Sequence, residues 1–205
     1  MEKLPIIPQQ WTWSKSGKHF VYVTSGSRGW AEYYSENGGI FVRITNMNFN
    51  TLDLNLTPEL IKFVSPPPSA EGIRTKIEKG DFLFSITGDL GMFAIAPSLK
   101  EAYVNQHIAL ARPLSVCNAK YLGFWIIAKS GGHYFLNKKR KGATKAGLGL
   151  DDIQNFPIPL CSVQEQIQIV QEIESRLSVC DKVEQIIAES LEKAEALRQS
   201  ILTKA

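Results

Sequence analysis

Residues 162–205 contain neither proline nor glycine, and this run sets a strong limit on what the C-terminal part of the chain can form. Alanine, glutamate, glutamine, leucine, isoleucine and lysine dominate it, and most of these residues are good helix formers. Ser162, with Glu165 three positions later, resembles a capping box, which marks the start of a helix. A helix of about 40 residues would be about 60 Å long. We therefore predict a globular domain over residues 1–160 and one long helix over residues 161–205.

An apolar stripe runs along the predicted helix. Eight steps cover 28 residues, so the mean spacing is that of a coiled coil. The positions in the stripe are Ile173, Leu177, Cys180, Val183, Ile187, Leu191 (or Ser190), Ala194, Leu197 and Ile201. We expect this stripe to pair with a partner helix as a dimerisation surface. The alternative is that it packs on its own globular domain.

Residues 1–160 show strand and helix signals without a regular alternation. Residues 39–44, 82–86 and 107–111 are short β-favouring runs bounded by turn signals. Residues 121–128 have the apolar density of a short buried helix, and the prolines at 66–68 predict an extended loop. This pattern predicts a mixed α/β domain with an irregular sheet and not a doubly wound fold.

Composition and charge narrow the class of protein. Hydrophobic residues make up 44% of the chain, which is enough for a sizeable core and argues against disorder. Residues 1–163 hold 18 Lys and Arg against 12 Asp and Glu, whereas residues 164–205 hold 5 against 8. A basic globular part joined to an acidic helix suggests a polyanionic partner for the globular part.

The sequence also predicts the compartment. The longest apolar run is shorter than the roughly 18 residues of a membrane helix. Residues 1–11 lack the pattern of a signal peptide. Cys117, Cys161 and Cys180 are odd in number and far apart, so we expect reduced, buried thiols. We therefore expect a cytoplasmic protein with no membrane partner.

A search for catalytic motifs finds none, so we expect no catalytic residue, no metal site and no cofactor on this chain. Phosphate-loop, dinucleotide-binding, paired-histidine zinc and nucleophile-elbow motifs are missing from the sequence. We interpret His107 as a hydrogen-bonded structural residue. We interpret Asp151 and Asp152 as the acidic start of a short helix.

The strongest signal for nucleic-acid binding lies between residues 137 and 147. Five cations fall within eight positions and are interleaved with Gly, Ala and Thr, which allow the backbone to approach a phosphate closely. The candidates are Lys138, Lys139, Arg140, Lys141, Thr144 and Lys145. The alternative is an ordinary solvated surface run.

Two further loops supply candidates for contacts with base edges. Arginine and asparagine can make bidentate hydrogen bonds to guanine and adenine. We select Arg28, Arg43, Asn46 and Asn48 on this basis. The alternative for the asparagines is turn formation.

Several segments in order resemble one family, the specificity (S) subunits of type I restriction–modification systems. They include a Pro-x-x-Trp at residues 8–11, FVRITNM at 41–47, KGDFLFS at 79–85 and NQHIA at 105–109, which is followed by RP. The most specific passage runs from residue 142 to residue 166 through GAT, a leucine, FPIPL and EQ. Cys161 stands where the family often continues with proline, which affects only the expected local loop geometry.

The resemblance implies a target-recognition domain that reads one half of a split sequence in double-stranded DNA, with helices that set the distance between the halves. It also implies modification subunits that bind S-adenosylmethionine and methylate adenine, and in some systems a restriction subunit. A usual S subunit has two such domains, whereas this chain has one.

A single-domain chain leaves the mode of assembly to be explained. We expect a homodimer through the helix that recognises an interrupted palindrome. The alternatives are half of a longer S protein, a scaffold protein with no DNA role, and a small-molecule enzyme.

Overall fold

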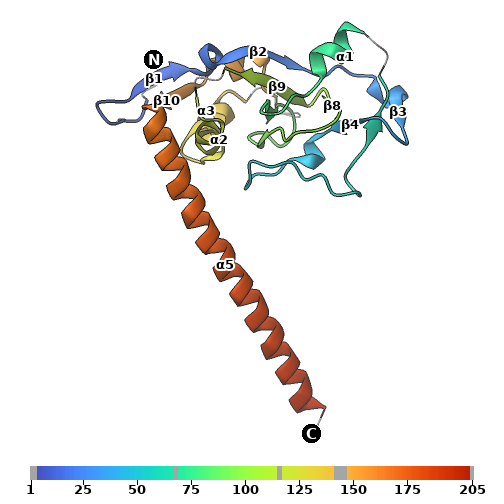
Figure 1. The fold of residues 1–205 in the computed structure, drawn as a ribbon, viewed down its shortest axis with the longest axis vertical. Coiled ribbons are helices and arrows are strands. Elements are labelled where there is room, and N and C mark those ends of the chain that lie inside the picture. The colour runs from blue at the N-terminus through green and yellow to red at the C-terminus, as the bar shows by residue number, and fades with distance from the viewer. Residues whose placement is uncertain (1–3, 67–68, 115–116, 141–146, 204–205) are drawn as a thin grey trace. The chain divides into compact units, whose positions relative to one another are not determined.

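The computed structural model of the chain describes residues 4–66, 69–114, 117–140 and 147–203. These residues form two compact units, Met1–Gln166 and Ile167–Ala205. The first unit holds every strand and all helices except most of α5 (Val163–Leu202) (Figure 1). The predicted mixed α/β domain followed by a long helix is confirmed.

A four-stranded antiparallel sheet forms the centre of the first unit. Its order is β2 (Phe20–Ser25), β9 (Ile108–Pro113), β6 (Phe82–Ser85) and β7 (Phe93–Ile95). The predicted strands at 82–86 and 107–111 are therefore confirmed. β9 begins one residue later than predicted because His107 belongs to the preceding turn.

Two smaller sheets complete the architecture. The mixed sheet has the order β3 (Tyr34–Ser35), β5 (Phe63–Val64), β4 (Gly39–Val42) and β8 (Ala102–Val104), and β4 runs parallel to β8. The third sheet is the antiparallel pair of β1 (Thr12–Lys15) with β10 (Pro157–Leu160). Sequence reasoning missed this pair because β10 contains two prolines, which normally argue against a strand away from a sheet edge.

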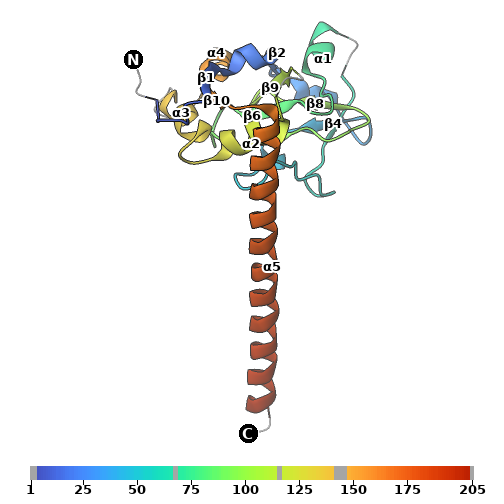
Figure 2. The same cartoon turned by 60° about the vertical axis from the view of Figure 1, so that its left-hand side comes forward.

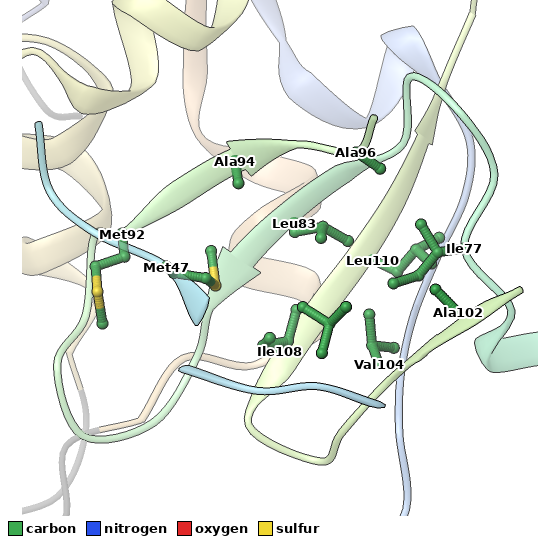
Figure 3. Close-up of a cluster of buried hydrophobic side chains, with 11 residues drawn as sticks. Met47, Ile77, Leu83, Met92, Ala94, Ala96, Ala102, Val104, Ile108 and Leu110 are labelled. Carbon is green, nitrogen blue, oxygen red and sulfur yellow. The ribbon is translucent and has the colours of Figure 1, made fainter. Parts of the chain in front are cut away.

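The central sheet is buried on both faces. Leu83 and Leu110 pair across β6 and β9 and join a cluster that reaches Val42 and Val104 of the mixed sheet (Figure 3). On the opposite face Phe82 and Phe84 lie opposite alanines of β9. Burial on both faces explains why Phe82, Leu83 and Phe84 are consecutive apolar residues and do not alternate with polar ones.

Short helices surround the central sheet. These are α1 (Ala70–Thr75), α2 (Ala119–Ile127), α3 (Gly132–Lys138) and α4 (Leu150–Asn155), with the 3₁₀ turns η1 (Ser16–His19), η2 (Trp30–Tyr33) and η3 (Ile44–Asn46). α2 confirms the helix predicted at 121–128, and it contacts β7 and α3. At α4 the Asp152 carboxylate accepts from Gly149 N at 2.8 Å, so the predicted acidic helix start is confirmed.

Helix α5 is continuous over Val163–Leu202, as predicted from its composition (Figure 2). Ser162 Oγ accepts from Glu165 N at 3.2 Å, which is half of the expected capping box. The Glu165 carboxylate instead accepts from Trp11 Nε1 at 3.0 Å. On the second unit, Ile173 of the apolar stripe is half-buried and every later stripe position, from Leu177 to Ile201, is exposed.

Two observations bear on the other predictions from composition. Within the described part of the chain, no helix combines the length and the apolar content needed to cross a membrane. The three cysteines are free, and Cys117 and Cys161 are half-buried. The prediction of a buried thiol is wrong for Cys180, because this residue lies on the exposed stripe of α5.

Candidate nucleic-acid interface

The turn between β6 and β7 is the point at which several predicted binding segments meet. Ile86 N donates to His107 O at 3.0 Å, which joins this turn to the one between β8 and β9. Thr87 forms an antiparallel bridge with Gly147, and Leu148 N donates to Ile86 O at 2.9 Å. The C-terminal end of the basic segment is therefore fastened to this turn.

His133 of α3 connects the other end of the basic segment to the same turn. A Cβ atom on Gly91 would lie 2.3 Å from His133 Cδ2, so the ring lies directly against the turn backbone. Phe49 makes an edge contact with the ring at 6.5 Å between centroids, and Asn137 Nδ2 donates to His133 O at 3.0 Å. Burial, and then the charge of Lys129, lower the pKa of His133. This region favours a neutral imidazole.

The described cations of the basic segment are exposed. Lys138 ends α3, with its ammonium 4.5 Å from the centre of the Tyr134 ring. Lys139 and Arg140 follow, with their backbone N–H groups donating to carbonyls of α3. Lys141, Thr144 and Lys145 lie outside the described residues. The contact of His133 with Phe49 joins the first turn of α3 to the loop that carries Asn48, and these cations lie at the other end of the same helix.

Arg28 is exposed on a loop that is tied to the turn between β8 and β9. Gly26 N donates to Asn105 O at 3.2 Å. Glu71 of α1 accepts from Ser27 N at 3.1 Å and from Trp30 Nε1 at 2.7 Å. Burial acts to raise the pKa of Glu71, but these hydrogen bonds outweigh it and the pKa is lowered. The Glu71 side chain is therefore an ionised carboxylate, and in this form it fixes the loop that carries Arg28.

The asparagine candidates differ in their surroundings. Asn46 is fully buried: its Oδ1 accepts from Arg43 N at 2.9 Å, and its Nδ2 donates to the carbonyls of Asn55 and Leu60. Such a side chain cannot reach a base edge while the loop is folded, so we remove Asn46 from the candidate interface. Arg43 Nη2 also donates to Leu60 O, at 2.9 Å, and its Nε is buried, so it too serves this loop.

Asn48 is half-buried and organises its own turn. Its Oδ1 accepts from Asn50 N at 2.9 Å and from Thr51 N at 2.8 Å. This is the turn role that sequence analysis left open as the alternative to a base contact. The turn presents Phe49, which is 46% exposed, beside His133.

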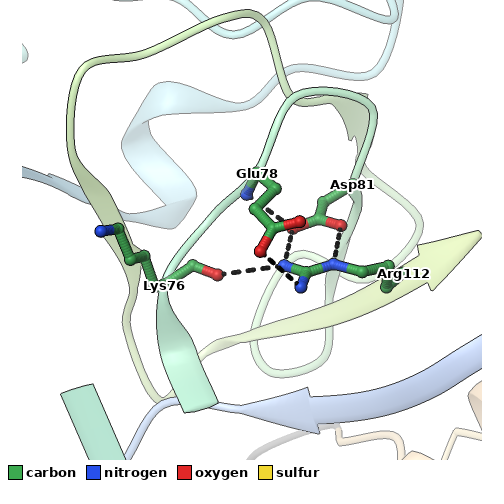
Figure 4. A network of polar contacts seen from close by, with 4 residues as sticks. All are labelled: Lys76, Glu78, Asp81 and Arg112. Carbon is green, nitrogen blue, oxygen red and sulfur yellow. Dashed lines mark hydrogen bonds and ion pairs between the residues drawn. The ribbon is translucent and has the colours of Figure 1, made fainter. Parts of the chain in front are cut away.

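Arg112 is excluded from the candidate interface by its partners. Its Nε and Nη2 donate to the two carboxylate oxygens of Asp81 at 2.8 Å, and Nη1 lies 2.7 Å from Glu78 (Figure 4). These hydrogen bonds raise the pKa of Arg112 against the effect of burial. The cluster fixes β9 to the segment that leads into β6 and leaves the guanidinium unavailable for phosphate.

Sequence reasoning missed a hollow beside the Arg28 loop. Its volume is about 260 Å³, and it is lined by Gly29, Trp30, Ala31, Tyr34, Phe41, Asn105, Gln106 and His107. His107 is hydrogen-bonded on both ring nitrogens, to Thr87 and to Gln106. The available signal was the polar triplet of residues 105–107 between two apolar strands, where a turn exposes side chains.

Cys117 and His19 lie close enough to be considered as a reactive pair. Cys117 Sγ lies 3.7 Å from His19 Nδ1, and His19 Nε2 lies 2.9 Å from Ser14 Oγ. Burial raises the pKa of Cys117, and burial followed by the charge of Lys18 lowers that of His19. Both shifts favour a neutral thiol, which is a poor nucleophile. Among the described residues no group of three or more His, Cys, Asp or Glu could hold a metal ion.

Comparison with known proteins places this geometry in context. Residues 69–195 match the family model described as "Type I restriction modification DNA specificity domain". The EcoBI type I restriction enzyme specificity subunit from Escherichia coli is 26% identical over 171 residues, which are 83% of this chain and 35% of that protein.

Solved structures show the same fold. A chain from a structure of a type I restriction–modification system is 21% identical, with a TM-score of 0.75 over 98% of this chain and 46% of that one. The HsdS subunit from Thermoanaerobacter tengcongensis is 22% identical, with a TM-score of 0.63 over 87% of this chain and 41% of that one. The chain thus spans about a third of the curated relative and less than half of these solved chains.

Proposed function

Because the chain belongs to the family of type I restriction–modification DNA specificity domains, we propose that its first unit reads one half of a split target in double-stranded DNA. The observation that carries this proposal is that the basic segment is joined at Gly147 to the β6–β7 turn, which is hydrogen-bonded to the β8–β9 turn that also holds the Arg28 loop. Cations on these loops supply salt-dependent affinity for phosphate. The polar turns between them supply groups that can enter a groove.

The chain acts in this proposal as a specificity subunit without chemistry of its own. It recruits modification subunits that hold S-adenosylmethionine and methylate adenine, and in some systems a restriction subunit joins them. The neutral thiol at Cys117 agrees with a non-catalytic role. We expect this assembly to act on DNA in the cytoplasm.

The second unit supplies the spacing between half-sites. The exposed stripe from Leu177 to Ile201 repeats at the coiled-coil period and suits pairing with a second helix. Pairing of two copies by a two-fold axis gives two reading units and a symmetric, interrupted target. A helix from a second S-type segment of a longer protein could pack against the same apolar stripe.

The salt dependence of binding tests the DNA-reading role. We expect the chain with its modification subunits to bind duplex DNA, with log K falling linearly against log salt. Lys139→Ala with Arg140→Ala removes two phosphate contacts and should reduce the slope by about two. Fluorescence anisotropy of a labelled duplex at a series of salt concentrations measures the slope for the wild type and for the double variant.

The matched control changes two cations outside the candidate interface. Lys79 and Lys100 are exposed and precede β6 and β8, at the strand ends away from the two turns. Lys79→Ala with Lys100→Ala should leave the slope unchanged. Equal slopes for both double variants would contradict the placement of the α3 cations on phosphate.

A further inference from the structure

The turn between β8 and β9 holds a glutamine in a fixed position at the edge of the hollow. Gln106 lines the hollow and is half-buried. The turn itself is rigid, because Asn105 Oδ1 accepts from His107 N at 3.0 Å and Asn105 N donates to Val42 O at 3.1 Å. The Gln106 side chain therefore starts from a well-fixed backbone.

A chain of hydrogen bonds fixes the direction of the Gln106 amide. Its Nε2 lies 3.0 Å from His107 Nε2, and His107 Nδ1 lies 2.5 Å from Thr87 Oγ1. An amide nitrogen can only donate, so His107 Nε2 is the acceptor and the ring proton is on Nδ1, where it donates to Thr87. Thr87 and His107 thus act as positioning residues for Gln106.

This arrangement leaves Gln106 with one acceptor and one donor side by side. Its Oε1 has no hydrogen-bond partner among the described residues, and the second hydrogen on Nε2 is not used by His107. An acceptor next to a donor complements the N6 amino group and N7 of adenine in the major groove. We propose that Gln106 reads the adenine of one A·T pair in the half-site, an inference that rests on the proposed function.

A second lining residue, Tyr34, suits the thymine of the same pair. Tyr34 lines the hollow and is 49% exposed. Its ring makes an edge contact with Phe41 at 5.8 Å, and Phe41 is stacked on Trp30 at 5.5 Å, so the ring is held in place. The C5-methyl group of thymine presents an apolar contact in the major groove. Tyr34 provides an apolar surface for it.

One positive charge lies next to the lining of the hollow. None of the lining residues carries a carboxylate, and Arg28 directly precedes Gly29 in the lining. Thr87, which contacts His107 of the lining, pairs with Gly147. Arg28 therefore supplies positive charge at the edge of the hollow that can hold a phosphate beside the base pair.

Selection from a randomised duplex library tests the assignment, with the full chain in complex with its modification subunits. We expect the wild type to select a defined half-site. Gln106→Ala should lose the preference at one A·T pair and keep it elsewhere. Gln106→Glu offers only acceptors and should move the preference at that pair toward cytosine, whose N4 group donates. Gln10→Glu, at an exposed glutamine before β1, should select the wild-type site.

The outcomes separate this inference from the proposed function. A wild-type complex with no sequence preference would overturn both. A wild-type preference that survives unchanged in both Gln106 variants would overturn only the assignment of Gln106. A Gln106 variant that binds all sequences more weakly but keeps the same base preferences would also overturn the assignment, since this result would point to a phosphate contact.

Modified DNA provides a test that needs no protein variant. In the selected site, 7-deazaadenine removes the N7 acceptor at the assigned pair, and deoxyuridine removes the methyl group of its thymine. Loss of the adenine contact should weaken wild-type binding by about tenfold, within the range of about 5- to 150-fold for a bidentate base contact. Unchanged affinity for 7-deazaadenine would overturn the direct contact.

Discussion

At the scale of single residues, two asparagines two positions apart have different roles. Asn46 joins three points of the same loop, at Arg43, Asn55 and Leu60, while Asn48 caps only its local turn. Nothing in the residue type distinguishes them, because both follow a predicted strand in a polar segment. Only burial distinguishes the two asparagines, and the burial of Asn46 depends on residues 55–60 folding back against it. The sequence could therefore nominate the loop but not the contact residue within it.

Stability measurements should separate the two asparagines. Asn46→Ala removes three hydrogen bonds made by a fully buried side chain and should reduce the free energy of unfolding by about 2–4 kcal/mol, at about 0.5–1.5 kcal/mol per hydrogen bond. Asn48→Ala, in a more exposed turn, should cost about 1 kcal/mol or less. Urea unfolding of both variants measures the difference, and equal losses would contradict the buried role of Asn46.

At the scale of elements, the β6–β7 turn depends on two glycines with positive φ. Gly88 has a φ of 74° and Gly91 a φ of 94°. A Cβ at Gly88 would meet nothing within 4 Å, whereas a Cβ at Gly91 would meet the His133 ring. The two positions therefore separate the cost of the backbone conformation from the cost of crowding α3.

Alanine substitutions should reveal this difference. Gly88→Ala should cost about 1–2 kcal/mol for the left-handed backbone alone. Gly91→Ala should cost more, and His133→Ala should recover part of the excess because it removes the crowding. A double-mutant cycle by chemical denaturation checks this. Additive effects of Gly91→Ala and His133→Ala would mean that the ring does not lie against the turn.

The elements that could be predicted share one property: their signal is local. β6 begins with three consecutive apolar residues and β9 with four, and α5 is long and free of helix breakers. The pair of β1 with β10 could not be predicted, because Trp13 meets Pro159 across most of the chain. The hollow depends in the same way on the Arg28 loop meeting the β8–β9 turn. Both the β1–β10 pair and the hollow depend on contacts between segments far apart in the sequence, and no local sequence pattern indicates such contacts.

At the scale of the whole molecule, the exposed stripe of α5 predicts association. Burying the side chains from Leu177 to Ile201 against a second copy would remove apolar surface from water, which favours the dimer. Light scattering over a concentration series should give about twice the 22.9 kDa mass of the chain. Leu191→Glu should shift the mass toward the monomer, whereas Glu192→Gln, a neighbouring change outside the stripe, should not.

A mass of 22.9 kDa at every concentration would contradict self-pairing. The stripe would then serve a different helix, such as one from a longer S-type protein. Mixing the chain with such a segment and repeating the measurement would show a one-to-one complex.

The pairing of β1 with β10 has a consequence for how such units can be exchanged. Thr12 lies opposite Leu160, and α5 begins at Val163, so the chain enters the first unit next to the point where it leaves for the helix. Domains whose ends lie close together tolerate insertion and transfer into other chains. We therefore expect that the segment between these two strands can be replaced as a cassette. Under the proposed function, a new reading unit would gain the same helix, and the spacing of the half-sites would be inherited unchanged.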